Sequence, residues 1–251
     1  MILVAQDTTY YGKDIYGKFM LSSLLKRLCR IRGLKWIRLM YTHPAHFTDE
    51  LIKTIAKEKK ICKYLDLPIQ HTCDNILALM GRRVTGREIS GLTRKIRRSI
   101  PGVVLRTSLI VGFPGESKKD FRRLLSFIEK ERFERLGIFT YWAEIGTPAN
   151  LMRGQVPEKV KRSRYQLAMR LQNRISEEQN KNKLNKVIEV MVDRITENGC
   201  VGRSFADAPE IDGYVVISSP NGENKEIIPG EVIRVGINGC SAYDLFGHPV
   251  T

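Results

Sequence analysis

The chain has 251 residues, 42% hydrophobic and 27% charged, which is enough for one medium-sized domain and a smaller one, each with a buried core. No apolar run approaches the ~18 residues of a membrane span, and the first residues lack the basic and apolar segments of a signal peptide, which favours a cytoplasmic protein without a membrane partner. The net charge of +15 divides into −6 over residues 187–251 and +21 over residues 1–186, an asymmetry that indicates two domains with different partners.

The first 145 residues repeat one pattern, a short apolar β run followed by an amphipathic helical segment. The predicted strands cover residues 2–6, 36–41, 64–70, 103–112 and 136–142. Thr48 and Ser117 are placed as helix N-caps, and Ser117 forms an approximate capping box with Asp120. The alternation predicts a parallel sheet, either a partial barrel or an open α/β sheet, with functional residues where strands end.

The pattern of predicted secondary structure changes in the remainder of the chain. A long basic helix is predicted from Pro157 to about residue 184, with Leu167, Leu171 and Ile175 spaced four apart. Short β runs separated by turn residues follow and predict a small antiparallel barrel. We therefore expect an α/β unit over residues 1–156, either a partial barrel or an open sheet, a connecting helix over 157–184 and an all-β barrel over 185–251.

The segment "LIVGFPGES" runs from Leu109 to Ser117 and joins a predicted strand to a predicted helix. Gly112 and Gly115 allow the backbone to approach a ligand closely, and Pro114 stiffens the turn. The segment matches neither a P-loop nor a G-x-G-x-x-G motif. By itself it is equally compatible with a ligand cradle and with an ordinary tight turn.

Two polar residues stand out near strand ends. Alternation places Arg106 on the same strand face as Ser108 and Ile110, where a guanidinium needs an anionic partner such as a ligand carboxylate, or else reaches solvent. His71, in "PIQHTCDN", is interpreted as a structural or substrate-facing loop histidine rather than as an acid–base group. The sequence identifies no catalytic residue.

Cysteines and basic residues each carry one further expectation. The five cysteines are scattered, with no CxxC or CxxxCxxC spacing, so we expect free thiols and no metal or iron–sulfur site. Residues 82–98 hold seven basic groups against one glutamate. This run is either a solvated helix face or a contact with RNA or a ribosomal surface.

With these residues assembled, the chain resembles the methylthiotransferases of the radical S-adenosylmethionine superfamily over essentially its whole length. The matching segments include "LVAQDTTYYG", "KYLDLPIQHTCDN", "LRTSLIVGFPGE" and "VGRSFADAPEIDG". The resemblance implies an incomplete radical-SAM α/β barrel followed by a small all-β TRAM barrel. It is strongest to the branch that methylthiolates the β-carbon of an aspartate on a small-subunit ribosomal protein.

That branch implies the partners and the site residues. The main partner is the basic ribosomal protein. Ribosomal RNA is an optional partner, contacted by the basic face of the barrel, and the enzyme is expected to be a monomer. The implied cofactor is S-adenosylmethionine, with Arg106 facing its methionine carboxylate. Its expected contacts are Gln70, Arg106, Val111, Gly112, Phe113, Gly115, Glu116 and Tyr141. Substrate docking is assigned to His71, Glu210, Asp212 and Asp244.

One departure from the family is large. The family carries an upstream domain with three cysteines for an auxiliary cluster, and a CxxxCxxC loop for the radical-generating [4Fe–4S] cluster, and neither is in this sequence. We therefore expect the chain to be a fragment, inactive alone, in which the strand at residues 2–6 has an unpaired edge.

Two other functions remain open. A transfer-RNA methylthiotransferase would have the same fold and chemistry, but "QDTTYYG", "PIQH" and the acidic C-terminal part oppose it. A non-enzymatic binding module is the other, and a cluster reconstitution test would distinguish it from an enzyme.

Overall fold

The computed structural model describes residues 1–218 and 227–250 and divides the chain into two compact units, Met1–Gln172 and Asn173–Thr251. The first unit contains a five-stranded sheet in the order β1-β2-β3-β4-β5, with every pairing parallel. Its strands are β1 (Ile2–Leu3), β2 (Ile37–Leu39), β3 (Ile61–Asp66), β4 (Val104–Val111) and β5 (Arg135–Thr140). An order without reversal is that of a barrel wall rather than of a doubly wound sheet, so the partial barrel is confirmed.

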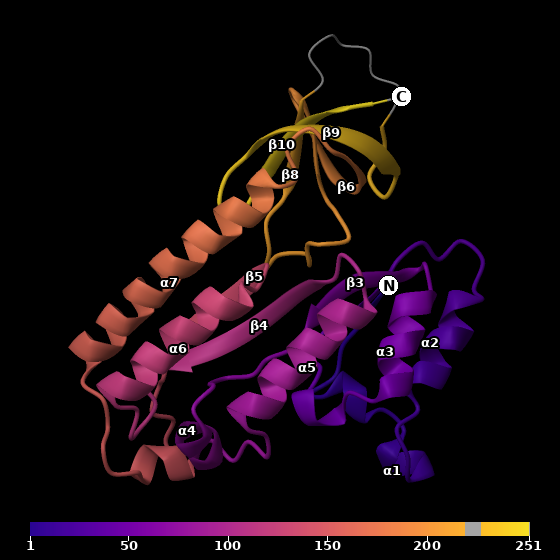
Figure 1. Cartoon of the computed structure of the whole chain (residues 1–251). Coiled ribbons are helices and arrows are strands. Elements are labelled where there is room, and N and C mark those ends of the chain that lie inside the picture. The colour runs from indigo at the N-terminus through magenta and orange to yellow at the C-terminus, as the bar shows by residue number, and fades with distance from the viewer. Residues whose placement is uncertain (219–226, 251) are drawn as a thin grey trace. The chain divides into compact units, whose positions relative to one another are not determined.

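Helices connect the strands, and Figure 1 shows α2, α3, α5 and α6 next to one another beside the sheet. The α-helices are α1 (Lys13–Tyr16), α2 (Leu21–Cys29), α3 (Asp49–Lys57), α4 (Asp74–Leu79), α5 (Gly86–Ser99), α6 (Lys118–Glu131) and α7 (Glu158–Lys181). The 3₁₀ helices are η1 (Thr8–Tyr10), η2 (Pro44–His46) and η3 (Pro148–Leu151). Among the described residues, no helix is both long and apolar enough to cross a membrane.

The helix starts follow the predicted caps. The Thr48 side chain accepts the Leu51 N–H at 3.1 Å, and Ser117 and Asp120 form the expected capping box. Strand β3 departs from its prediction: it starts at Ile61 and ends at Asp66, earlier than expected. Pro68 lacks an N–H for a continued ladder, so the chain leaves the sheet near that residue.

Burial alternates along β4 and distinguishes the two faces of the sheet. Leu105, Leu109 and Val111 are 0% exposed, whereas Arg106 and Ile110 are half-buried. The first set packs on the helix side, and the second faces the interior of the open barrel. This inner face is the surface that the barrel offers to a ligand.

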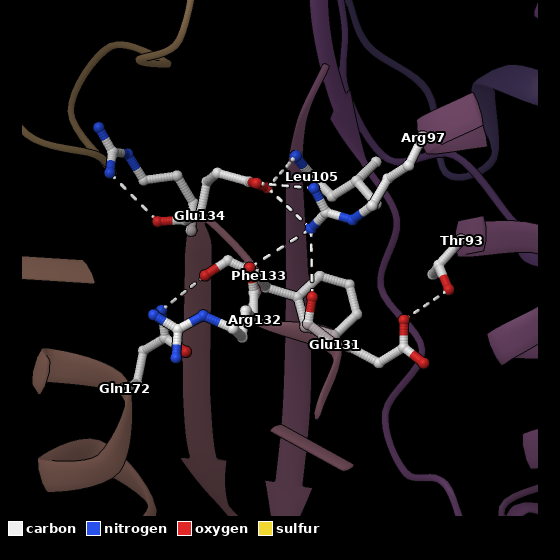
Figure 2. Close-up of polar contacts among 9 residues, drawn as sticks. Thr93, Arg97, Leu105, Glu131, Arg132, Phe133, Glu134 and Gln172 are labelled. Atoms are coloured by element: carbon white, nitrogen blue, oxygen red, sulfur yellow. Dashed lines mark hydrogen bonds and ion pairs between the residues drawn. The ribbon is translucent and has the colours of Figure 1, made fainter. Parts of the chain in front are cut away.

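A polar network fixes the amino ends of β4 and β5 (Figure 2). Arg97 of α5 lies 2.7 Å from a carboxylate oxygen of Glu134, whose other oxygen accepts the Leu105 N–H at 2.8 Å. Gln172 donates from its side-chain amide to the Phe133 carbonyl at 2.9 Å. The opposite, carboxyl ends of the strands are left to form loops.

Helix α7 has an unusual buried face. Leu167 is 43% exposed, whereas Lys161, Arg164 and Gln172 are nearly fully buried. Leu167 therefore lies outside the packed face, whereas Ile175 of the same series is 0% exposed, so the spacing marks the packed face only in the second half of the helix. Polar side chains attach the first half of this helix to the α/β unit.

The second unit contains a closed barrel in the order β10-β8-β7-β6-β9. Its strands are β6 (Val187–Thr196), β7 (Gly199–Arg203), β8 (Val215–Ser218), β9 (Val232–Cys240) and β10 (Leu245–Pro249). Four pairings are antiparallel, but β8 and β10 run parallel, so the all-antiparallel expectation is wrong at the strands that close the barrel. Its interior is apolar, with Val190, Val215 and Val235 all at 0% exposure.

Candidate functional site

The loop after β4 closes on itself through Glu116. Gly112 and Gly115 adopt φ angles of +76° and +84°, the left-handed region that favours glycine. The Gly112 N–H donates to the Glu116 carboxylate, and the Glu116 N–H donates to the Phe113 carbonyl at 2.9 Å. The motif is therefore a tight turn held by its own acidic residue.

Arg164 of α7 completes this turn. Its Nη1 donates to the Glu116 carbonyl at 3.0 Å and lies 3.2 Å from the carboxylate Oε1, close enough for an ion pair but not aligned as a hydrogen bond. Burial raises the pKa of Glu116, while Arg164 and the two backbone N–H groups of Gly112 and Phe113 act against that rise. The carboxylate thus faces protein partners, whereas the sequence assigned it to a ligand.

Lys161 covers the first glycine of the loop. A Cβ at Gly112 would lie 2.4 Å from the Lys161 Cγ, so the close approach of this side chain requires glycine. The Lys161 ammonium is 2.6 Å from Glu158 and 5.2 Å from the centre of the Tyr141 ring. Lys161 and Arg164 were missed in the sequence because they lie on a helix read only as basic.

Phe113 and Tyr141 form the apolar floor beneath this loop. Their rings meet edge to face at 5.1 Å, and Cys73 and Ile76 complete the cluster. Tyr141 is 8% exposed, and its hydroxyl has no hydrogen-bond partner among the described residues. A buried hydroxyl without a partner is the feature of this floor that a polar ligand group would satisfy.

Gln70 lies beside the inner face of β4. Its N–H donates to the Ser108 carbonyl at 2.9 Å, and its carbonyl accepts the Ile110 N–H at 2.8 Å. Its φ of +68° is unusual for a residue other than glycine and is held by this isolated bridge to β4. Val111 points the other way with 0% exposure, so its side chain packs within the protein, and its assignment as a cofactor contact stays a prediction.

Arg106 faces the barrel interior as predicted, and a protein carboxylate is bound to it. Its Nη1 is 2.9 Å from Oδ1 of Asp66, which is 0% exposed, and Oδ2 of Asp66 accepts the Tyr41 N–H at 2.9 Å. Strand register explains the pair, because Asp66 lies opposite Arg106 in the ladder. The guanidinium carries five N–H donors, so this ion pair is compatible with a second carboxylate.

His71 is completely buried, which corrects its assignment to substrate docking. Its Nδ1 accepts the Cys73 N–H at 3.0 Å, and Nε2 has no partner among the described residues. Burial lowers the pKa of His71 to about 4, with Asp120 acting against the shift and Arg164 adding to it. The imidazole is therefore neutral at physiological pH and serves the loop between β3 and α4.

Three potential metal ligands meet where β1 and β2 end. Asp7, His43 and His46 are the one group of at least three such side chains, among the residues described, with ligand atoms within 4.8 Å of one another. His46 Nδ1 lies 2.6 Å from Asp7 Oδ2, and His43 Nδ1 accepts the Ala45 N–H at 3.2 Å. Burial, Arg82 and His46 lower the pKa of His43. No spacing of these three residues along the chain predicts this group.

The cysteines do not fit an iron–sulfur cluster. None of the five forms a disulfide, and within the part of the chain that the structure describes none belongs to a group of potential metal ligands; they are Cys29, Cys62, Cys73, Cys200 and Cys240. A [4Fe–4S] cluster requires several thiolates together. The expectation of free thiols is therefore consistent with the positions of these residues.

The acidic residues assigned to docking in the second unit differ in role. The Asp212 carboxylate accepts the Ala208 N–H at 2.9 Å, and the Asp244 carboxylate accepts the Tyr214 N–H at 2.9 Å. Both carboxylates hold loops and are only half-buried, so their assignment to docking stays a prediction beside this structural role. Glu210 is exposed, with a φ of +68°, and is free to meet a partner.

Comparison with known families agrees with both units. The Radical SAM superfamily profile matches residues 1–128, about half of the chain, and the TRAM domain profile matches residues 186–250. The chain belongs to the radical SAM superfamily. Coproporphyrinogen III oxidase (HemN) from Escherichia coli shares the fold of the first unit with a TM-score of 0.52, at 16% identity over 68% of this chain and 39% of that one.

Curated relatives define the branch more closely. The chain is 48% identical over 250 residues to a protein from Desulforamulus reducens and 49% identical over 253 residues to one from Pelotomaculum thermopropionicum. Both are named ribosomal protein uS12 methylthiotransferase RimO. The alignments cover 98% and 100% of this chain but 55% and 56% of the relatives, so the chain spans about half their length.

Proposed function

We propose that this chain is the S-adenosylmethionine-binding and substrate-docking part of a ribosomal-protein methylthiotransferase of the RimO type. The observation that carries the proposal is the inner face of β4, which carries Arg106, is bridged by Gln70 and leads into the glycine loop, next to which the buried Tyr141 hydroxyl has no hydrogen-bond partner among the described residues. High identity to proteins named for this activity supports the same reading. Such an enzyme would act as a monomer in the cytoplasm, where its ribosomal substrate is made.

In this proposal the chain's own residues bind and orient the cofactor. Arg106, fixed by Asp66, would hold the methionine carboxylate through a charge-assisted hydrogen bond. Gln70 would offer its side-chain amide next to it, and Tyr141 would donate its buried hydroxyl. Glu116, Gly112 and the residues of α7 would shape the loop instead of contacting the ligand.

When bound in a complete enzyme with its clusters, S-adenosylmethionine supplies the methyl group and the radical that the methylthiolation requires. This chain does not hold the thiolates for a cluster, so no step of electron transfer is assigned to its residues. Its contribution is orientation of the cofactor and exclusion of water from the barrel interior.

Binding of S-adenosylmethionine to the chain, measured by titration calorimetry, tests the site. Gln70→Gly removes the amide and also relieves the positive φ, so a loss of binding would not reflect misfolding. We expect this variant and Arg106→Lys each to weaken binding about 10- to 100-fold, the range for a hydrogen bond to a charged group. Gly91→Ala, at a helical glycine outside the site with nothing within 4 Å of the added Cβ, serves as a control for backbone changes. Unchanged affinity in both site variants would refute the assignment.

Docking to a basic protein is the second part of the proposal. It is supported by the net charge of −6 over residues 187–251 and by the exposure of Glu210. Purified protein uS12 should bind the full chain with an affinity that falls as salt rises, and Glu210→Lys should slow association. Glu197→Lys makes the same charge reversal at another exposed position of this unit and serves as the matched control for Glu210→Lys. Tight transfer-RNA binding with none to uS12 would instead support a transfer-RNA methylthiotransferase.

A further inference from the structure

A basic groove lies between α5 and α6, outside the site described above. It has a volume of about 590 Å³ and is closed at one end by the start of α4, at Thr72 to Asp74. Four cationic side chains line it: Arg87, Arg94, Arg123 and Lys130. Asp74 is the single acidic lining residue, and its carboxylate accepts the Gly86 N–H at 2.8 Å. The lining therefore carries a clear excess of positive charge.

The four groove cations have no acidic partner among the described residues, whereas two other basic residues of α5 do. Arg97 pairs with Glu134 and Lys95 pairs with Asp49. Within residues 1–218 and 227–250, no hydrogen bond or ion pair is found for the side chains of the four groove cations. The groove cations are therefore available to an anion from outside.

The spacing of these cations suits a linear anion. Arg87 and Arg94 are seven residues apart on α5, as are Arg123 and Lys130 on α6, and seven residues rise about 10 Å along a helix. Each wall therefore offers positive charge at two levels. A strand with a phosphate at every nucleotide would meet cations on both sides, whereas a single phosphate ion would reach only some of them.

Two further lining residues favour a nucleic acid. Gly91 lies in the middle of α5, and nothing is found within 4 Å of the position that a Cβ would take. This open floor leaves room for a backbone to approach. Phe127 of α6 lines the groove with a half-buried ring, a surface on which a base can stack.

We propose that the groove between α5 and α6 binds the phosphate backbone of an RNA strand. The charge of +21 over residues 1–186 would draw the strand to this unit, and the four cations would hold it by releasing its counterions. Cys73 lines the groove and also packs in the apolar floor of the candidate site, but none of the residues proposed to contact S-adenosylmethionine lines the groove. The two proposals therefore stand or fall separately.

Gly91 provides the sharpest test. Gly91→Glu places a negative charge on the groove floor, and it meets no steric conflict and improves helix propensity. Gly91→Ala gives a similar gain in helix propensity without the charge and is the matched control. Fluorescence anisotropy with a fluorescein-labelled 20-nucleotide oligo(U) RNA should show about tenfold or greater weakening for Gly91→Glu and near-native binding for Gly91→Ala. Equal affinity in the two variants would overturn the proposal.

A pair of charge-removing substitutions distinguishes binding of RNA in the groove from its general attraction to the positive charge of the unit. Arg94→Gln with Arg123→Gln should lower the salt dependence of RNA binding by about 1.4 in logarithmic slope, at about 0.7 per phosphate contact on a single strand. Arg98→Gln with Arg122→Gln removes the same charge from exposed positions on the same helices outside the groove. An equal loss in both pairs would mean that no specific site exists.

Competitors identify the kind of anion. Polyglutamate of matched charge and inorganic phosphate should displace the RNA far less well than unlabelled oligo(U). Equal competition by polyglutamate would assign the groove to an acidic protein, and effective competition by millimolar phosphate would reduce it to a single-anion site. Either result would overturn the proposal. Binding of S-adenosylmethionine should be unchanged in all the groove variants.

Discussion

Replacing Arg164 with methionine is expected to destabilise the α/β unit, and to do so more at neutral pH than at acid pH. Methionine keeps the length and volume of the side chain but removes the charge beside Glu116, whose side chain is 0% exposed. Removing one partner of a buried ion pair leaves an uncompensated charge, which costs about 3–5 kcal/mol. The loss of the hydrogen bond to the Glu116 carbonyl falls within the same range.

The pH dependence follows from the pKa of Glu116, which burial raises above its ordinary value of 4.5. The folded state then holds this proton to a higher pH than the unfolded state does, so stability falls as pH rises through the window between the two pKa values. Arg164 opposes the rise in pKa, and without it the window extends further upward. The Arg164→Met variant should therefore recover part of its stability as the pH is lowered toward 5, because a larger fraction of Glu116 is then protonated.

Urea unfolding monitored by tryptophan fluorescence provides the measurement at pH 5 and at pH 7.5. The two tryptophans of the chain, Trp36 and Trp142, both lie in the Met1–Gln172 unit, so the signal reports on that unit alone. Adding Glu116→Gln to Arg164→Met removes the buried charge and should abolish the difference between the two pH values. A cost below ~1 kcal/mol at pH 7.5, or one independent of pH in the single variant, would refute the reasoning.

Three further outcomes are expected. Gly112→Ala should lower stability by about 1–3 kcal/mol in thermal unfolding, because it strains a φ of +76° and forces back the lysine above it; native stability would show that the loop readily rearranges. Glu134→Gln should cost about 1–3 kcal/mol in urea unfolding, since it removes the carboxylate bound by Arg97, and a neutral result would mean that the network in Figure 2 adds nothing. In the native protein at pH 8, iodoacetamide should modify the half-buried Cys240 before Cys73, because burial and Asp120 raise the pKa of the Cys73 thiol to about 11; faster labelling of Cys73 would contradict this.

Several features of the fold were available from the sequence because they depend on local patterns. The period of apolar residues located all five strands of the sheet, and the caps at Thr48 and Ser117 were visible as side chains placed before helical segments. Strand alternation also put Arg106 on the inner face of β4. The five strands could not be assigned from pattern alone to a barrel or an open sheet, because both have the same βα alternation.

Site residues were harder to predict because the group that a side chain contacts often belongs to a segment far away in the sequence. Arg106 was read as awaiting a ligand carboxylate, but Asp66 on the next strand lies opposite it. His71 follows a strand end, where exposure is common, yet the packing of its loop buries it fully. Nothing local to either residue indicates these contacts.

The sequence by itself determined the order of elements, their approximate positions, the division of charge along the chain and the resemblance to one family, since each depends on residues close together or on their total. The tertiary structure alone decided which charged side chains pair with other groups of the protein. It brought Lys161 and Arg164 of α7 onto the glycine loop and left four cations unpaired between α5 and α6. The physical reason is that the energy of a charge is set by its burial and by its neighbours in space, and both appear only when the helices pack.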